Sequence, residues 1–358
     1  MAQQVTIIGA GITGLTLGLL ATRAGLPVTL VDPGLRLGER DGLMGAPAGL
    51  QQELQYHHVE RWWGDAGLQA YAEQVRRGQQ LVLACAADCG VPVTRAEQAT
   101  LTADGREAFW LRHEVVAMRQ AGLQPVFTDE TGLPFSTRPQ LVLPDQPVLD
   151  LIAYRDALAA ALTEAGGVIT TTGASPDGWT VSTTPEPVFD RALIRPRLRR
   201  ADWSWVELAS ADPAAFPLRS GTDLDDGGRI WARRGDRLWL GSRRQDSRAQ
   251  AARWFPEAEV IASWSAPAAA SLDSLPLVGY AGSPADKRLV ATGFDAWELT
   301  LGSAAALQLV DVLTGKGRVD LPWSPVRLAR PLSVLRAGWS TARHALRVSP
   351  VSPFPRRG

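Results

Sequence analysis

The feature that most constrains the fold is the glycine motif Gly9-Ala10-Gly11-Ile12-Thr13-Gly14 near the start of the chain. A short apolar run rich in β-branched residues, 5–8, comes directly before it, and a helical pattern over residues 15–24 follows it. A second apolar run, 27–31, ends on Asp32. This order predicts a strand, a glycine-rich turn, a helix and a second strand, which is the βαβ unit of a Rossmann fold.

Each part of the motif has a physical task in binding a dinucleotide. Gly9 permits a tight turn, Gly11 lacks a Cβ and lets the backbone approach a pyrophosphate, and Gly14 lets the helix pack close to the strand. The phosphates then bind the free N–H groups at the helix N-terminus. The carboxylate of Asp32 accepts hydrogen bonds from an adenosine ribose and argues against NADP, whose 2′-phosphate favours an arginine there.

The motif therefore predicts a dinucleotide site, but it does not distinguish FAD from NAD. A second segment, 288–303, reads as a strand and a loop and continues into a helix that ends near residue 313. We expect Thr300, Gly302 and Ser303 at this helix N-terminus, where the backbone suits a polar or partly negative ring edge. This second segment, and a glycine motif so near the N-terminus, favour FAD.

These two segments resemble the D-amino-acid-oxidase-like superfamily of FAD oxidoreductases. The closest similarity is to the branch whose members often carry a C-terminal Rieske iron–sulfur domain. Three further stretches carry the resemblance: residues 132–135 with 146–165, residues 183–190, and residues 264–279. The resemblance implies an α/β fold, with a Rossmann-type FAD-binding domain and a second, antiparallel-sheet α+β substrate domain.

The resemblance also implies that FAD is bound without a covalent link and that the last strand–loop–helix covers its isoalloxazine. Trp297 and Glu298 are then expected beside the flavin, although no catalytic residue is assigned. The expected cofactor-binding residues are Gly9, Ala10, Gly11, Ile12, Thr13, Gly14, Asp32, Arg40, Gly293, Thr300, Leu301, Gly302 and Ser303.

Several features depart from the family pattern. The chain has no C-x-H and C-x-x-H pair for a Rieske cluster, and the loop 38–48 lacks the Ser/Thr-rich signature usual near the flavin. Glu298 stands where a small residue is expected, and a carboxylate there crowds or repels a reduced, anionic flavin. Many relatives place an arginine for the substrate carboxylate within the stretch 264–273, which contains none here.

The expected domain layout is discontinuous. Residues 1–80, 148–192 and 286–325 form the FAD-binding domain, and residues 81–147 and 193–285 form the substrate domain. Within the latter, residues 229–233 and 237–241 alternate in polarity around Gly235-Asp236, which predicts a hairpin. Residues 326–358 form a basic tail with a possible helix over 331–348, which either packs on the FAD domain or contacts a partner or membrane surface.

Composition narrows the function. Lys+Arg and Asp+Glu both count 37, so the balanced charge gives no reason to expect nucleic acid as a partner. No apolar stretch is long enough for a transmembrane segment, and the histidines and cysteines show no metal-binding spacing. Only two cysteines occur, which suits a cytoplasmic location.

The sequence leaves three functional hypotheses. The first is an FAD-dependent oxidoreductase that transfers a hydride from a small amine or amino-acid-like substrate to flavin. The second is a degenerate member of the flavoprotein fold that has a binding or scaffold role and no turnover, which the departures at the flavin end favour. The third is an NAD(P)-dependent enzyme, in which the segment 288–303 would have no role.

Overall fold

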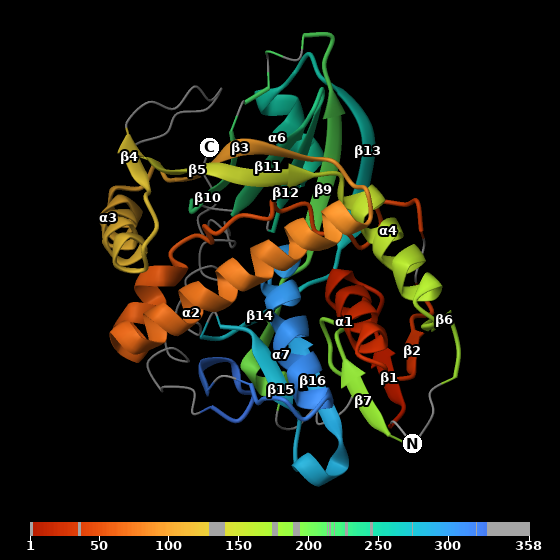
Figure 1. The fold of residues 1–358 in the computed structure, drawn as a ribbon. Coiled ribbons are helices and arrows are strands. Elements are labelled where there is room, and N and C mark those ends of the chain that lie inside the picture. The colour runs from red at the N-terminus through yellow and green to blue at the C-terminus, as the bar shows by residue number, and fades with distance from the viewer. Residues whose placement is uncertain are drawn as a thin grey trace, which may run out of the picture.

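The computed structural model describes residues 3–327 except 35–36, 129–139, 174–177, 189–193, 213, 215, 218, 226–227, 244–245, 274 and 320. These residues build two large sheets and one short ribbon. Figure 1 shows the six-stranded sheet in the lower half of the molecule and the eight-stranded sheet in the upper half, with the long helix α2 crossing between them.

The six-stranded sheet contains the predicted βαβ unit, so the Rossmann-type part of the fold is confirmed. Its order is β15-β16-β7-β1-β2-β6, with β15 antiparallel to β16 and the remaining strands parallel. The strands are β1 (Val5–Ile8), β2 (Val28–Val31), β6 (Val168–Thr170), β7 (Trp179–Ser182), β15 (Leu277–Tyr280) and β16 (Arg288–Thr292). Because β1 lies between β2 and β7, its carboxyl end opens where open α/β sheets bind ligands.

Three helices pack together beside this sheet. Helix α1 (Ile12–Arg23) contacts both α4 (Leu151–Glu164) and α7 (Ser303–Leu313). Eight of its twelve residues are apolar or glycine, its only charged residue is Arg23, and nine of its residues are buried. A helix with apolar residues around most of its circumference must be covered on most sides, which explains why α1 lies between the sheet and other helices.

The eight-stranded sheet has the order β13-β9-β12-β11-β10-β3-β5-β4, and all its pairs are antiparallel except β3 with β10. The predicted hairpin is confirmed, because β11 pairs with β12 around Gly235, whose φ of 64° suits glycine. The strands are β3 (Val93–Leu101), β4 (Val126–Thr128), β5 (Gln140–Leu149), β9 (Trp203–Ala209), β10 (Ser220–Asp223), β11 (Arg229–Arg234), β12 (Arg237–Ser242) and β13 (Glu259–Ala266).

A two-stranded ribbon and several further helices complete the described elements. The ribbon pairs β8 (Leu198–Arg200) with β14 (Ala269–Ser271) in antiparallel register. The helices are α2 (Gln55–Asp88), α3 (Gly105–Gln120), α6 (Ser247–Trp254), η1 (Arg195–Arg197), η3 (Pro284–Asp286), the π-helical turn η4 (Glu298–Gly302) and η5 (Leu321–Trp323).

Two expected domain boundaries fall inside connected parts of the structure. Helix α2 begins at Gln55 and continues past a kink at Gly64 to Asp88, so it crosses the domain boundary predicted at residue 80. Strand β15 pairs with β16, so the boundary predicted at residue 286 separates two strands of one sheet. The stretch 132–135 and the predicted tail helix 331–348 lie outside the described residues.

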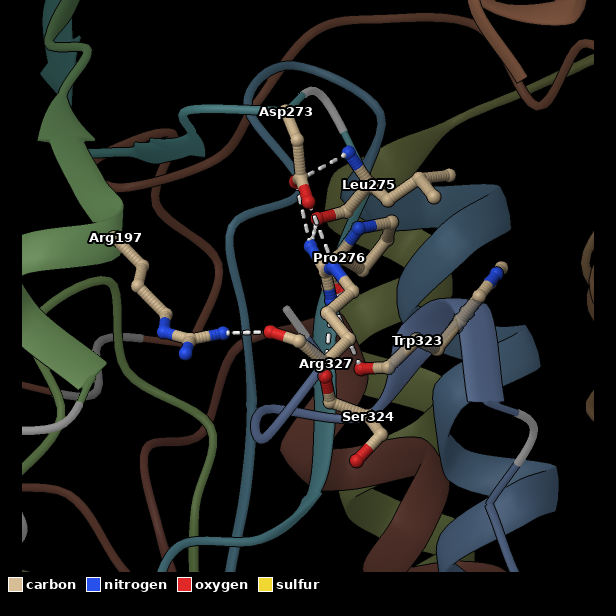
Figure 2. Close-up of polar contacts among 7 residues, drawn as sticks. All are labelled: Arg197, Asp273, Leu275, Pro276, Trp323, Ser324 and Arg327. Carbon is tan, nitrogen blue, oxygen red and sulfur yellow. Dashed lines mark hydrogen bonds and ion pairs between the residues drawn. The ribbon is translucent and has the colours of Figure 1, made fainter. Parts of the chain in front are cut away.

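The last described residue, Arg327, holds the C-terminal segment onto the core (Figure 2). Its buried guanidinium forms two ion-pair contacts with Asp273, at 2.6 and 2.7 Å. It also donates to the main-chain oxygens of Leu275, Pro276, Trp323 and Ser324. Arg197 donates to the main-chain oxygen of Arg327, which ties the same point to the start of β8. Loss of the Arg327 guanidinium would remove its contacts with Asp273 and with these main-chain oxygens at once, so we expect it to loosen the end of the described chain.

Candidate cofactor site and active site

The glycine turn after β1 has no room for side chains. Gly9 has a φ of 106°, and a Cβ there would lie 2.9 Å from a methyl group of Thr184. A Cβ on Gly14 would lie 1.9 Å from the main-chain oxygen of Gly9. The hydroxyl of Thr183 donates to the main-chain oxygens of Ile8 and Gly9, at 3.1 and 3.0 Å, so the end of β7 fixes the turn from the side.

Asp32 lies at the end of β2, where the motif predicts a contact with ribose. One carboxylate oxygen accepts a hydrogen bond from the main-chain N–H of Ala10 at 2.7 Å, and the other accepts from Gly34 at 2.8 Å. These two bonds hold the carboxylate beside the glycine turn. Its contact with a ribose remains a prediction.

The N-terminus of α1 is capped by a residue from the other end of the chain. Gly11 is the N-cap residue, no side-chain hydrogen bond caps the helix from that position, and the first turn contains no acid. Glu298, the first residue of η4, supplies the missing acceptor. Its Oε1 accepts from the main-chain N–H of Thr13 at 3.2 Å and from the Thr13 hydroxyl at 3.1 Å. The two predicted cofactor segments therefore meet.

The same carboxylate stands over Gly11. A Cβ built on Gly11 would lie 2.7 Å from Oε1 of Glu298, so Glu298 fills the space that the absent side chain leaves for a pyrophosphate. Burial raises the pKa of the Glu298 carboxyl, and the two hydrogen bonds from Thr13 oppose that rise. The glycine turn, the helix N-terminus and Asp32 have the chemistry that the adenosine diphosphate part of FAD requires. The carboxylate of Glu298 lies where the motif predicts the pyrophosphate of that part.

The remaining predicted residues of the C-terminal segment pack around α1 and a cavity. Gly302 approaches α1 so closely that a Cβ there would lie 2.1 Å from the hydroxyl of Thr13. The hydroxyl of Thr300 donates to the main-chain oxygen of Gly49 at 3.3 Å, and that of Ser303 donates within its own turn, to Leu299 at 2.7 Å. Gly293 and Leu301 line the cavity described below.

Arg40 has a different neighbour from the one expected. Its guanidinium forms an ion pair with Glu207 of β9, in the eight-stranded sheet. The side chain of Glu207 is buried, so this pair joins the loop after β2 to the second sheet. A contact of Arg40 with the cofactor remains a prediction.

A cavity of about 230 Å³ lies between the start of α2, the β8–β14 ribbon and the loop that joins β16 to η4. Trp297 lines this cavity, while the neighbouring Glu298 faces α1. The polar part of the lining includes four charged residues: Glu53, Glu107, Arg199 and Asp295. The predicted flavin-side residue Trp297 thus lies at a cavity that is rich in ionisable groups.

Two cavity carboxylates form ion pairs with one partly buried arginine. Arg243 contacts Asp295 at 2.6 Å and Glu53 at 3.5 Å, and its guanidinium lies 4.9 Å from the ring centre of Trp203. Trp203 donates its indole N–H to Asp295 at 3.0 Å. Burial alone would lower the pKa of Arg243, but Asp295 and Glu53 more than offset it and the pKa is raised. Asp295 and Glu53 both have positive φ, 52° and 58°, a costly backbone conformation that is often found at functional sites.

The sequence analysis does not identify the charged residues of this cavity, and Arg199 is the most informative of them. It lies directly opposite Ala270 in the β8–β14 ribbon, and both residues line the cavity. Ala270 belongs to the stretch 264–273, where relatives were expected to carry an arginine. The partner strand therefore supplies a guanidinium at this place. No local pattern marks the pairing, because the two strands lie far apart in the sequence.

Comparison with known proteins agrees with this fold. The profile of the DAO family, described as FAD dependent oxidoreductase, matches residues 4–194, which is more than half of the chain. The chain belongs to this family, whose cofactor is FAD.

Individual relatives are distant. A curated protein from Bacillus subtilis (strain 168), named putative Rieske 2Fe-2S iron-sulfur protein YhfW, is 23% identical over 351 residues, covering 87% of this chain and 69% of that protein. Glycine oxidase from Geobacillus kaustophilus has a TM-score of 0.74 at 16% identity, covering 92% of this chain and 100% of the other. L-Proline dehydrogenase from P. horikoshii has a TM-score of 0.69 at 14% identity, covering 91% and 97%.

In the part of the chain that the structure describes, no helix combines the length and the apolar character needed to cross a membrane.

Proposed function

We propose that the protein oxidises a small amine or amino-acid-like substrate by hydride transfer to FAD. The observation that carries this proposal is the cavity beside Trp297, which has acidic side chains and one arginine in its lining. FAD would bind through the glycine turn, Asp32 and the η4–α7 segment. The substrate would occupy the cavity.

The charges of the cavity suit a substrate with an amino group. The lining contains three carboxylates, Glu53, Glu107 and Asp295, and one guanidinium, that of Arg199. An ammonium group is therefore attracted to this lining, whereas a hydroxy acid without one is not. Arg199 adds a planar guanidinium, which binds a carboxylate through two parallel hydrogen bonds. Together these groups support an amino-acid-like substrate.

The size and the relatives point the same way. A cavity of about 230 Å³ is below the usual range for drug-sized ligands, so the substrate is small. Glycine oxidase and L-proline dehydrogenase are named for amino-acid substrates and share this fold. Oxidation of an amine removes a hydride from carbon and a proton from nitrogen, and bound FAD supplies the hydride acceptor. The part of this chain is to orient the substrate beside Trp297 and to exclude water.

A substrate panel tests the proposal. The FAD-loaded protein is mixed without oxygen with small amino acids, with the matching amines and with the matching hydroxy acids, and the visible flavin absorbance is followed. We expect amino acids to bleach the flavin, amines to act more weakly and hydroxy acids to be inert. A flavin that dithionite reduces but no member of the panel bleaches would contradict the proposal.

The second candidate is a degenerate flavoprotein fold with a binding or scaffold role. The observation that favours it is the contact of Glu298 with α1, which fills the expected pyrophosphate position. This candidate predicts no turnover of any panel member, with or without FAD. The panel therefore separates the two candidates.

We also propose a cytoplasmic location, where Cys85 and Cys89 would stay reduced. The basic tail 326–358 is proposed to contact a partner or a membrane surface, because it contains six arginines besides the buried Arg327 and no acidic residue. Sedimentation of the full chain with anionic vesicles tests the membrane alternative.

A further inference from the structure

The N-terminus of α1 needs an acceptor in every state of the protein. The first N–H groups of a helix have no partner within the helix, and they attract negative charge. Gly11 offers no side chain to cap them, and the first turn of α1 contains no acid. In a dinucleotide-binding unit the pyrophosphate fills this role. In this chain the carboxylate of Glu298 fills it.

Glu298 and a pyrophosphate require the same place. Oε1 of Glu298 accepts from the main-chain N–H of Thr13 and lies 2.7 Å from where a Cβ on Gly11 would be. At that point the motif leaves the backbone uncovered, so that a phosphate can come close to it. Two anions brought together away from bulk water repel each other strongly. The two occupants are therefore mutually exclusive.

We propose that Glu298 is an internal occupant of the pyrophosphate position, so that FAD binds only when this carboxylate withdraws from α1. The inference rests on the proposed function in taking FAD as the ligand. The inference also implies that the apo protein is fully folded, with the N-terminus of α1 capped by Glu298. FAD affinity is then reduced by the fraction of molecules in which the position is open.

The neighbouring contacts indicate which part moves. Gly302 lies against Thr13 so closely that no Cβ fits between them, and Thr300 is hydrogen-bonded to Gly49. These contacts hold the backbone of η4 beside α1. The side chain of Glu298 is therefore the part that must rotate away, while Trp297 keeps its place at the cavity.

Two variants of Glu298 test the inference on purified apo protein. Glu298→Ala removes the carboxylate, and Glu298→Gln keeps its shape without the charge, which provides a second variant if the first fails to fold. The Kd for FAD is measured by isothermal titration calorimetry, and the Tm of each apo protein is measured in parallel. We expect the Kd of Glu298→Ala to fall by about tenfold or more, because the position becomes permanently open.

The Tm of the apo protein should fall by a few degrees in Glu298→Ala, because α1 loses its cap. Tighter FAD binding together with a less stable apo protein is a combination that simple damage to the fold does not produce. Asp246→Ala serves as a matched control, because Asp246 caps α6 through the N–H of Arg248 at 2.9 Å, away from the glycine turn. It should lower the Tm and leave the Kd unchanged.

The outcomes separate this inference from the proposed function. Equal or weaker FAD binding by both Glu298 variants, with tight binding by the natural chain, overturns the inference and leaves the proposed function intact. Failure of all three proteins to bind FAD overturns both. A gain in affinity with no bleaching by the substrate panel supports the inference and contradicts the proposed function alone.

Discussion

Arg199 is the residue that most directly links the cavity to a substrate class. It faces Ala270 across the β8–β14 ribbon and reaches the cavity from a strand that no local motif marks. A guanidinium paired with a substrate carboxylate contributes about 1.5–3 kcal/mol, which is roughly a tenfold to hundredfold change in affinity. We expect Arg199→Ala to raise KM for an amino acid by about that factor with little change in kcat.

The rise in KM should be specific for substrates that carry a carboxylate, and an amine provides the control. The matching amine has no carboxylate, so its KM should not change in Arg199→Ala. Arg200→Ala is the matched control, because Arg200 is the next residue of the same strand, is exposed and pairs with Asp202. An equal loss for the amino acid and the amine would show that Arg199 does not hold a carboxylate.

At the residue scale, the sequence predicted the residues whose roles are local. Gly9 and Gly14 are constrained by a turn that spans a few residues, so their pattern is readable without a structure. Glu298 was recognised as out of place, but its partner Thr13 was not, because 285 positions separate them. Arg199 was missed for the same physical reason, since strand pairing over long sequence distances leaves no local signal.

At the scale of elements, the start of helix α2 is capped by a buried carboxylate from another helix. The buried carboxylate of Glu114, on α3, accepts from the main-chain N–H groups of Tyr56 and His57 at 3.0 and 2.7 Å, which caps the start of α2. Burial raises the pKa of Glu114 from 4.5 to about 8, although the two hydrogen bonds lower it. Between about pH 4.5 and pH 8, Glu114 therefore keeps its proton in the folded protein and loses it in the unfolded chain.

The sign of the pH dependence follows from that proton. Because the folded protein binds more protons than the unfolded chain from about pH 4.5 to about pH 8, the free energy of unfolding falls as pH rises through this window. The slope from this group is roughly 1 kcal/mol per pH unit. Urea unfolding at a series of pH values should show this slope in the natural chain and lose it in Glu114→Gln. Identical slopes in both proteins would contradict the role given to Glu114.

Elements with a strong periodic pattern were predicted well, and elements defined by their partners were not. Strand β1, helix α1 and the β11–β12 hairpin follow from apolar periodicity and glycine placement. Helix α2 continues through the kink at Gly64, and its length depends on its packing against other elements, so the boundary predicted at residue 80 falls inside it. Strand β15 has only four residues, and nothing in its own sequence indicates which sheet it joins.

For the whole molecule, the contacts between distant segments determine where the two sites lie. The Arg40–Glu207 pair connects the loop after β2 to the eight-stranded sheet, and the Arg327–Asp273 pair fixes the end of the described chain (Figure 2). Helix α1 and the turn η4 meet at the predicted pyrophosphate position, and the cavity lies on the other side of that turn, beside Trp297. The discontinuous domain layout stays a prediction, although helix α2 crosses its boundary at residue 80 and the pairing of β15 with β16 spans its boundary at residue 286.

We propose above all that this chain holds one FAD without a covalent link. The most direct test is to saturate the purified natural chain and Glu298→Ala with FAD and to remove free ligand by gel filtration. Each protein is then denatured, and the released cofactor is identified and quantified by mass spectrometry. We predict about one FAD per chain in Glu298→Ala, less in the natural chain, and none left attached to the polypeptide. Protein that retains no FAD in either form, or that retains NAD instead, would contradict this account.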